Sequence, residues 1–452
     1  MGEPTRPAAG SVATMAAEPH STPMSRVAAS CLVGSAIEFY DFLIYGTAAA
    51  LVFPSVFFPG LSPAVAMVAS MGTFATAFLS RPVGAIVFGH FGDRLGRKKT
   101  LICTLLLMAV ATVSVGLIPS TASIGMAAPL ILMLLRLVQG FAVGGEWAGS
   151  ALLSAEYAPA GRRGLYGMFT LLGGGLAGVL SSLTFLGVNV TIGEHSPAFL
   201  QWGWRLPFLI SAALIGLALY VRLNIDETPV FAEEQARVLV PKAPLTEVLR
   251  LQRREILLAG GSVLGAMAFC YMGNTYFAMY AHSHLGYTRS FIWSVGVLSG
   301  LVSIASVMFS ASLCDRVGRR RMMLVGWGAC VPWSFVVLPL IDTGKPVLYA
   351  VAIVGTFAVA GIGSGPTGAF IPELFATRYR YTGSALAVNL AGVIGGALPP
   401  LIAGTLLAAY GSWSIGVMLA VLALASLVST YLLPETNGTA LRAAKAASSV
   451  GV

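Results

Sequence analysis

Asp93-Arg94-Leu95-Gly96-Arg97-Lys98-Lys99 is a basic signature that recurs, 222 residues later, as Asp315-Arg316-Val317-Gly318-Arg319-Arg320-Arg321. Each copy is flanked on both sides by long apolar runs. A dense positive cluster between two membrane-length segments is typical of a short cytoplasmic loop. Its recurrence indicates the tandem duplication of a membrane unit, an arrangement that is common among secondary transporters.

The composition predicts a membrane protein. Of the 452 residues, 56% are hydrophobic and 10% are charged, and the mean hydropathy is +0.82. Soluble domains carry about 25% charged residues, and a soluble fold of this size needs a large polar surface. These values exclude a soluble fold and favour an all-α protein that crosses the membrane many times, because helices satisfy their own backbone groups in lipid.

The net charge of +9 is explained by the expected topology. Of the 27 Lys and Arg residues, all but five fall where we place the cytoplasmic face. Three of the five, Arg205, Arg289 and Lys345, are placed on the outside. The other two, Arg81 and Arg136, are placed within the membrane. This pattern favours anionic membrane lipids as the partner of the basic face and argues against a nucleic acid.

Twelve apolar segments are long enough to span a bilayer, which takes about 20 residues each. The expected spans are 28–53, 63–90, 100–118, 129–157, 164–190, 203–223, 255–282, 290–313, 322–341, 346–371, 382–408 and 412–433. They are expected to form two pseudo-symmetric six-helix bundles. The expected domains are a disordered tail 1–25, a first bundle 26–223, a polar loop 224–254, a second bundle 255–433 and a short tail 434–452.

The loops that carry basic residues follow the even-numbered spans. Both termini are therefore expected in the cytoplasm, with the chain multi-pass in the cell inner (plasma) membrane. The two bundles already provide a pseudo-two-fold pair, so we expect a monomer.

A second repeat supports the duplication. Glu156 precedes Arg162 at the inner end of the fourth span, and Glu373 precedes Arg378 at the inner end of the tenth. The offset between the two glutamates is 217 residues, close to that of the basic signature.

Several motifs resemble those of a known family. The inner loop Gly89-x-x-Gly92-Asp93-Arg94-x-Gly96-Arg97-Lys98 and the segment Arg136-x-x-Gln139-Gly140 resemble the major facilitator superfamily. Residues 38–46, 139–146 and 202–208 narrow the resemblance to its metabolite:H⁺ symporters, which transport shikimate, 2-oxoglutarate, citrate or proline/betaine. The resemblance implies the major facilitator fold and proton-coupled uptake of a small organic acid anion. A zwitterionic osmolyte symporter and an efflux antiporter of the same fold remain alternatives.

Other function classes lack their signatures. A membrane enzyme needs a metal cluster or a nucleophile pair near the interface, and the sequence offers neither. A channel needs filter residues repeated by identical subunits. The five cysteines form no CxxC pair and no Walker motif is present, so we expect no disulfide, metal or cofactor.

Ionisable residues inside a membrane are functional candidates because they are costly to keep there. Glu38 and Asp41 lie three residues apart in the first span and are expected to share a helical face. Glu38 and Arg81 each lie ~18 Å from the inner surface, at 1.5 Å per residue, near the midplane. Desolvation favours a protonated carboxyl, which would free the planar guanidinium of Arg81 for a substrate carboxylate. The alternative is a fixed structural ion pair.

The fourth span carries two further candidates. Arg136 could hold the substrate or relay protons, or it could only pair with an acidic neighbour. Glu146 could lie on a proton path, or it could make a buried hydrogen bond between helices.

Polar and aromatic side chains in later spans could line a substrate cavity. The candidates are Tyr271, Asn274 and Tyr276 in the seventh span and Asn389 in the eleventh. Packing between helices is the alternative for each of them.

We expect the repeated signatures to act as a conformational latch. An Asp is not needed by the positive-inside rule, so Asp93 could cap a neighbouring helix or pair with Arg162 in one state of the transport cycle. The latch candidates are Gly89, Gly92, Asp93, Arg94, Gly96, Arg97, Glu156, Arg162, Asp315, Arg319, Glu373 and Arg378.

Overall fold

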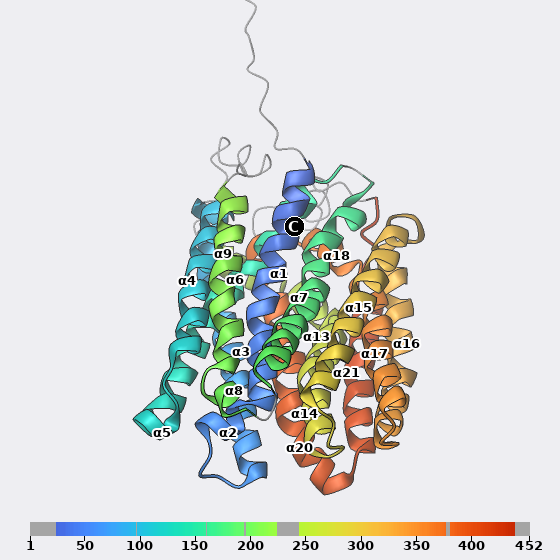
Figure 1. Ribbon diagram of the computed structural model, residues 1–452. Helices are drawn as coiled ribbons and strands as arrows, with labels where there is room; N and C mark the ends of the chain where they lie inside the picture. The colour runs from blue at the N-terminus through green and yellow to red at the C-terminus, as the bar shows by residue number, and fades with distance from the viewer. Residues whose placement is uncertain are drawn as a thin grey trace, which may run out of the picture.

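The computed structural model describes residues 24–95, 97–159, 161–193, 196–223, 244–376 and 380–438. Within these ranges twelve helical segments are long and apolar enough to cross a membrane. Figure 1 shows them standing side by side, with both described ends of the chain at one end of the molecule. We call this end the terminal face and the other end the opposite face.

The first half of the chain forms one bundle. Its elements are α1 (Met24–Leu51), α2 (Phe53–Phe57), α3 (Pro63–Leu95), α4 (Arg97–Leu117), α5 (Thr121–Ile124), α6 (Ala127–Tyr157), α7 (Arg163–Ile192), α8 (Pro197–Gln201), the 3₁₀ turn η1 (Gly203–Arg205) and α9 (Leu206–Leu223). Within it, α1 is the central helix, since 78% of its membrane-length window is buried.

The second half forms the other bundle. Its elements are α11 (Pro244–Leu251), α12 (Arg253–Ser262), α13 (Leu264–Tyr271), η2 (Met272–Tyr276), α14 (Phe277–Ser283), α15 (Arg289–Val317), α16 (Arg319–Asp342), α17 (Pro346–Ser364), α18 (Thr367–Glu373), α19 (Arg380–Ala391), η4 (Gly392–Ala397), α20 (Leu398–Tyr410) and α21 (Trp413–Leu432). Two of these segments, η2 and η4, are π-helical turns inside the seventh and eleventh spans. Such turns often mark functional sites.

The twelve predicted spans are confirmed, but the short loops predicted at the basic signatures are wrong. The second signature is helical on both sides of a single connecting residue, Gly318, which has a φ of 109°. Glycine adopts this left-handed conformation at little cost, so α15 passes into α16 within one residue. In the first signature α3 likewise runs to Leu95 and α4 starts at Arg97.

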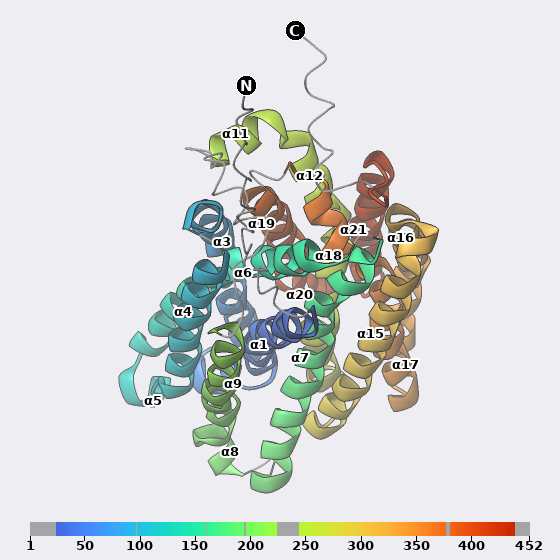
Figure 2. The ribbon, with the colours of Figure 1, turned by 90° about the horizontal axis from the view of Figure 1, so that it is seen from above.

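The two bundles meet along two seams. Seen from above, the blue-to-green helices lie on one side and the yellow-to-red helices on the other (Figure 2). One seam joins α7 to α15, and the other joins α3 to α19 and α20. A Cβ atom on Gly300 would lie 2.9 Å from the backbone oxygen of Gly175, so the first seam depends on small residues.

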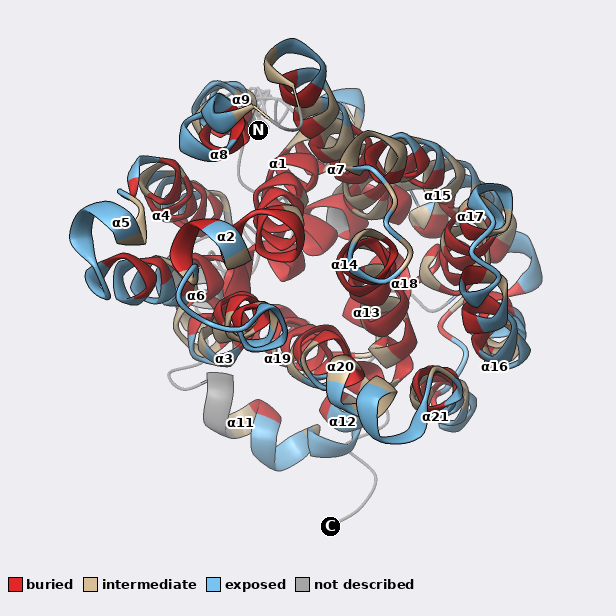
Figure 3. Ribbon diagram, turned by 60° about the horizontal axis from the view of Figure 1, so that its bottom comes forward, coloured by how far each residue is buried: buried red, intermediate tan, exposed pale blue. Residues whose placement is uncertain are grey.

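The outer surface is suited to lipid. Figure 3 shows exposed residues on the outer sides of the peripheral helices and buried residues on α1, α13 and α14. Large apolar side chains such as Val110, Leu134 and Val325 are exposed there. An apolar exterior over so many helices is what a bilayer requires.

Candidate functional site

The carboxyl of Asp41 is held inside the first bundle by two hydroxyl groups. Thr112 of α4 donates to Oδ2 at 2.9 Å, and Ser211 of α9 donates to Oδ1. Asp41 is only 2% exposed. A buried carboxyl needs such donors, because an unsatisfied one is costly in an apolar interior.

A chain of hydrogen bonds continues from Asp41 to Arg136. Gln139 donates through Nε2 to the Thr112 hydroxyl at 2.7 Å, and Arg136 donates through Nη1 to Gln139 Oε1 at 2.9 Å. Arg136 also donates through Nη2 to the backbone oxygen of Phe74 at 3.3 Å. Arg136 and Gln139 lie one helical turn apart on α6, and this spacing brings their side chains together.

Both predicted membrane arginines stack on the ring of Phe42. The guanidinium carbons of Arg81 and Arg136 lie 4.1 and 4.3 Å from its centroid. Arg81 also lies over Phe78, and Arg136 lies 3.7 Å from the centroid of Tyr45. Aromatic faces stabilise a desolvated cation by roughly 2 kcal/mol, so these rings help to keep both charges in the interior.

Arg81 lies where the two bundles meet. Tyr271 of α13 packs edge-on against Phe42 and Phe78 with centroids 5.9 and 5.1 Å apart, and it interacts with Arg81. A Cβ atom on Gly392 of η4 would lie 3.4 Å from Nη1 of Arg81. The guanidinium is therefore next to both π-helical spans of the second bundle.

The predicted carboxylates lie around this cluster. Arg81 and Glu38 both interact electrostatically with Tyr271. Glu146 is fully buried and interacts electrostatically with Asp41. Although Glu38 and Asp41 are three residues apart, the carboxyl of Asp41 bonds to α4 and α9 inside the first bundle, while Glu38 interacts electrostatically with Tyr271 of the second bundle.

A cavity of about 120 Å³ lies between the bundles. Its polar lining includes Asn274 of η2, Cys270 of α13, and Ser299 and Ser303 of α15. Its aromatic lining is Phe39, Trp147 and Phe357. Of the predicted binding residues, only Asn274 lines this cavity.

Sequence reasoning missed the lining residues of the first bundle. Phe39 and Trp147 directly follow the predicted Glu38 and Glu146, so the motifs pointed to the correct turns of α1 and α6. A smaller cavity of about 30 Å³ lies further along and shares Asn274 and Ser299 with the larger one.

The remaining candidates of the second bundle do not line the larger cavity. Tyr276 is buried, and its ring stacks on that of Tyr280 at 6.4 Å. Asn389 donates through Nδ2 to the backbone oxygen of Gly144 at 2.7 Å, which joins α19 to α6 across the seam.

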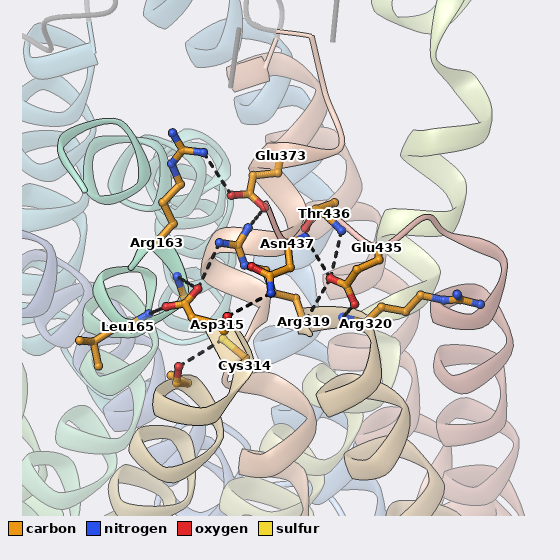
Figure 4. A network of polar contacts seen from close by, with 12 residues as sticks. Arg163, Leu165, Cys314, Asp315, Arg319, Arg320, Glu373, Glu435, Thr436 and Asn437 are labelled. Atoms are coloured by element: carbon orange, nitrogen blue, oxygen red, sulfur yellow. Dashed lines mark hydrogen bonds and ion pairs between the residues drawn. The ribbon is translucent and has the colours of Figure 1, made fainter. Parts of the chain in front are cut away.

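The second signature forms a polar network between the bundles at the terminal face (Figure 4). Asp315 accepts hydrogen bonds from the backbone N–H groups of Gly164 and Leu165, each at 3.0 Å. These groups belong to the first turn of α7, so an acid of one bundle caps a helix of the other.

Two arginines complete the network. Arg319 pairs with Asp315 at 3.3 Å and also with Glu373, and Arg163 of α7 lies 3.9 Å from Glu373. Arg163 therefore bridges the bundles, whereas its neighbour Arg162, which we predicted as a partner of Asp93, has an exposed side chain. Gly89 packs against Thr382 of α19. The other latch candidates lie outside the side chains that the structure describes: Gly92, Asp93, Arg94, Gly96, Arg97, Glu156 and Arg378.

Contacts between the bundles also occur at the opposite face. Arg289 donates to the backbone oxygen of Leu51 at 3.0 Å, and Asn189 donates to the hydroxyl of Ser290 at 2.6 Å. The cavity therefore has contacts between the bundles on both sides.

Comparison with known proteins identifies the family. Residues 31–400 match the Major Facilitator Superfamily model. This chain belongs to the major facilitator superfamily. The inner membrane metabolite transport protein YhjE of Escherichia coli K12 is 37% identical over 95% of this chain and 99% of its own length. The shikimate transporter of the same organism is 35% identical over 91% of this chain and 95% of its own length.

Other similarities support the same assignment. The proline/betaine transporter of Salmonella typhimurium LT2 is 32% identical over 92% of this chain and 85% of its own length. The proton:xylose symporter XylE has the same fold, with a TM-score of 0.70 and 17% identity over 93% of this chain and 98% of that one. The protein is thus a multi-pass membrane transporter and not an enzyme.

Proposed function

We propose that this transporter takes up a small organic acid anion together with H⁺ by alternating access. A shikimate-like compound or a di- or tricarboxylate is the favoured class of substrate. The relative named a shikimate transporter supports a carboxylate substrate. Two arginines in the membrane interior also favour an anion, because a guanidinium matches a carboxylate in shape and charge.

The observation that carries the proton coupling is the position of Asp41. Its carboxyl is buried in the membrane interior and connects through two side chains to Arg136. A buried carboxyl is a candidate proton carrier. Glu38 and Glu146 are the other acids near this path, and Arg81 is the favoured substrate partner at the junction of the bundles.

The remaining roles follow from alternating access. The substrate occupies the cavity beside Asn274. This cavity of about 120 Å³ must widen to hold most metabolites, because a cavity of ~150 Å³ is the size that binds benzene. The Asp315 network closes the terminal face in one state and breaks in the other. The terminal face is cytoplasmic in this proposal, and the chain works as a monomer.

A zwitterionic osmolyte is the second candidate. The aromatic side chains of Phe39, Trp147 and Phe357 line the cavity and suit a quaternary ammonium group. Relatives named proline/betaine transporters support this reading. An efflux antiporter would use the same fold in the other direction.

Uptake into vesicles tests the proposal. Purified protein is reconstituted and offered labelled shikimate, 2-oxoglutarate, citrate and proline with an imposed pH gradient. We expect an acid to accumulate, a protonophore to abolish its accumulation, and Na⁺ to have no effect. Uptake that survives collapse of the pH gradient but requires Na⁺ would contradict the proposal, and accumulation of proline alone would favour the second candidate.

A further inference from the structure

The hydrogen bonds from Asp41 to Arg136 all run in one direction. Arg136 donates to the Gln139 carbonyl, the Gln139 amide nitrogen donates to Thr112, and Thr112 donates to Asp41. An ionised carboxylate only accepts, so the Thr112 hydroxyl must give it its single hydrogen. Thr112 can then only accept from Gln139, which turns the Gln139 carbonyl toward Arg136.

We propose that Thr112 and Gln139 are positioning residues that report the proton occupancy of Asp41 to Arg136 by reversing this hydrogen-bond chain. The proposal rests on the proton coupling proposed above and assigns a role to two side chains beyond it. It requires no ligand other than the proton.

The reversal follows from the donors and acceptors of each group. A proton on Oδ2 of Asp41 makes that oxygen a donor to Thr112. The Thr112 hydroxyl then directs its own hydrogen to Gln139, whose amide must rotate to present its carbonyl oxygen. The amide NH₂ group now faces Arg136, which has only donors, so Arg136 loses its acceptor on Gln139.

The release of Arg136 reaches the junction of the bundles. Arg136 keeps its bond to the Phe74 oxygen and its contact with Phe42. Because Arg81 stacks on the same Phe42 ring, a movement of Arg136 changes the packing around Arg81 and Tyr271. The chain thereby links a proton inside the first bundle to the interface where the bundles separate.

The groups that face Asp41 are consistent with this role. Glu146 and Arg136 act on it from α6, and Tyr40 lies beside it on α1. The two helices whose side chains bond to it, α4 and α9, present the hydroxyls of Thr112 and Ser211. A variant Glu146→Gln therefore shows whether a titrating carboxyl signal belongs to Asp41 or to its neighbour.

Infrared difference spectroscopy between acidic and alkaline buffer tests the proposal on purified protein without substrate. We expect a carboxylic-acid carbonyl band that is lost in Asp41→Asn and kept in Glu146→Gln. We also expect a glutamine amide band that is lost in Gln139→Met. Its intensity should change over the same pH range as that of the carboxyl band.

Variants of Thr112 decide whether the two signals are coupled. Thr112→Val should keep the carboxyl band but lose the amide band. Thr112→Ser, which retains the hydroxyl, should show both bands. Thr104→Val is the matched control, because Thr104 is equally buried on α4 and donates to Leu101 of its own helix. Ser211→Ala, on the Oδ1 side, should also keep both bands.

The outcomes separate this inference from the proposed function. An amide band that persists in Thr112→Val, or that is absent from the wild type, would overturn the chain reversal even if vesicle uptake is driven by protons. A coupled amide band in a protein whose uptake ignores the pH gradient would support the chain and contradict the symport.

Discussion

At the residue scale, position on a helix separates two acids that are close in sequence. Residues three apart on an α-helix differ by about 60° in direction. Here Asp41 bonds to α4 and α9, while Glu38 interacts electrostatically with Tyr271 of the second bundle. The sequence could predict that both acids lie deep in the membrane. It could not predict their partners, because Thr112 and Ser211 are ordinary apolar-span residues without a motif.

Asp41→Asn should uncouple transport from protons. An amide cannot take up and release a proton, so the variant should fail to accumulate substrate against its gradient. It should still exchange external for internal substrate, because the cavity and the bundle interfaces are unchanged. Counterflow and gradient-driven uptake, measured on the same vesicles, check this. Normal proton-driven accumulation by the variant would remove Asp41 from the mechanism.

Arg81→Ala should lower the affinity for the transported anion by about 2–4 kcal/mol if a charged hydrogen bond is lost in a desolvated site. Arg81→Lys should not restore binding, since an ammonium loses both the bidentate fork and the flat stacking on Phe42. Equilibrium binding to monodisperse protein is the measurement. Near-wild-type affinity in Arg81→Ala would assign Arg81 to structure and make Arg136 the preferred anion partner.

At the element scale, the repeated signature is a pair of helix ends and not a loop. Hydropathy marks where a span leaves the membrane, but a helix can continue into polar sequence when its end is capped. Glu435 accepts from the backbone N–H groups of Arg319 and Arg320 and so caps α16. The π-helical turns η2 and η4 could not be predicted from the sequence pattern either, because they need no special composition.

Asp315→Ala should open the terminal face. It removes a charged cap from α7, which is worth about 1 kcal/mol, and this amounts to a shift of about fivefold toward the open state. Alkylation of Cys270, whose side chain lines the cavity, should become faster. Glu435→Ala is the matched control: it also removes a helix cap, but one within the second bundle, so it should leave the rate unchanged. Equal effects of the two variants would argue against a latch.

At the scale of the whole molecule, composition and duplication were sufficient to predict twelve spans in two bundles, and the family resemblance implied the major facilitator fold. They could not locate the cavity, because its walls combine α1, α6 and α7 with α13, α15 and α17 across the seam between the bundles. These six helices come from both halves of the chain. Phe39 and Ser299 therefore line one cavity although no relation in the sequence predicts it.

Substrate in the cavity should protect Cys270 from N-ethylmaleimide. The thiol lies among the lining residues beside Asn274. We expect a transported acid to slow its alkylation, measured by mass spectrometry, and to leave the exposed Cys103 unaffected. Equal slowing at both sites, or none at Cys270, would place the substrate elsewhere.

The movement of protons with substrate is the most direct test of the central claim. Vesicles without any imposed gradient are suspended in weakly buffered medium, and shikimate, 2-oxoglutarate, citrate or proline is added while the external pH is recorded. For the transported compound we predict a rise in external pH that is absent with Asp41→Asn protein, because each substrate carries protons inward. Uptake of labelled compound with no change in pH would contradict proton-coupled symport.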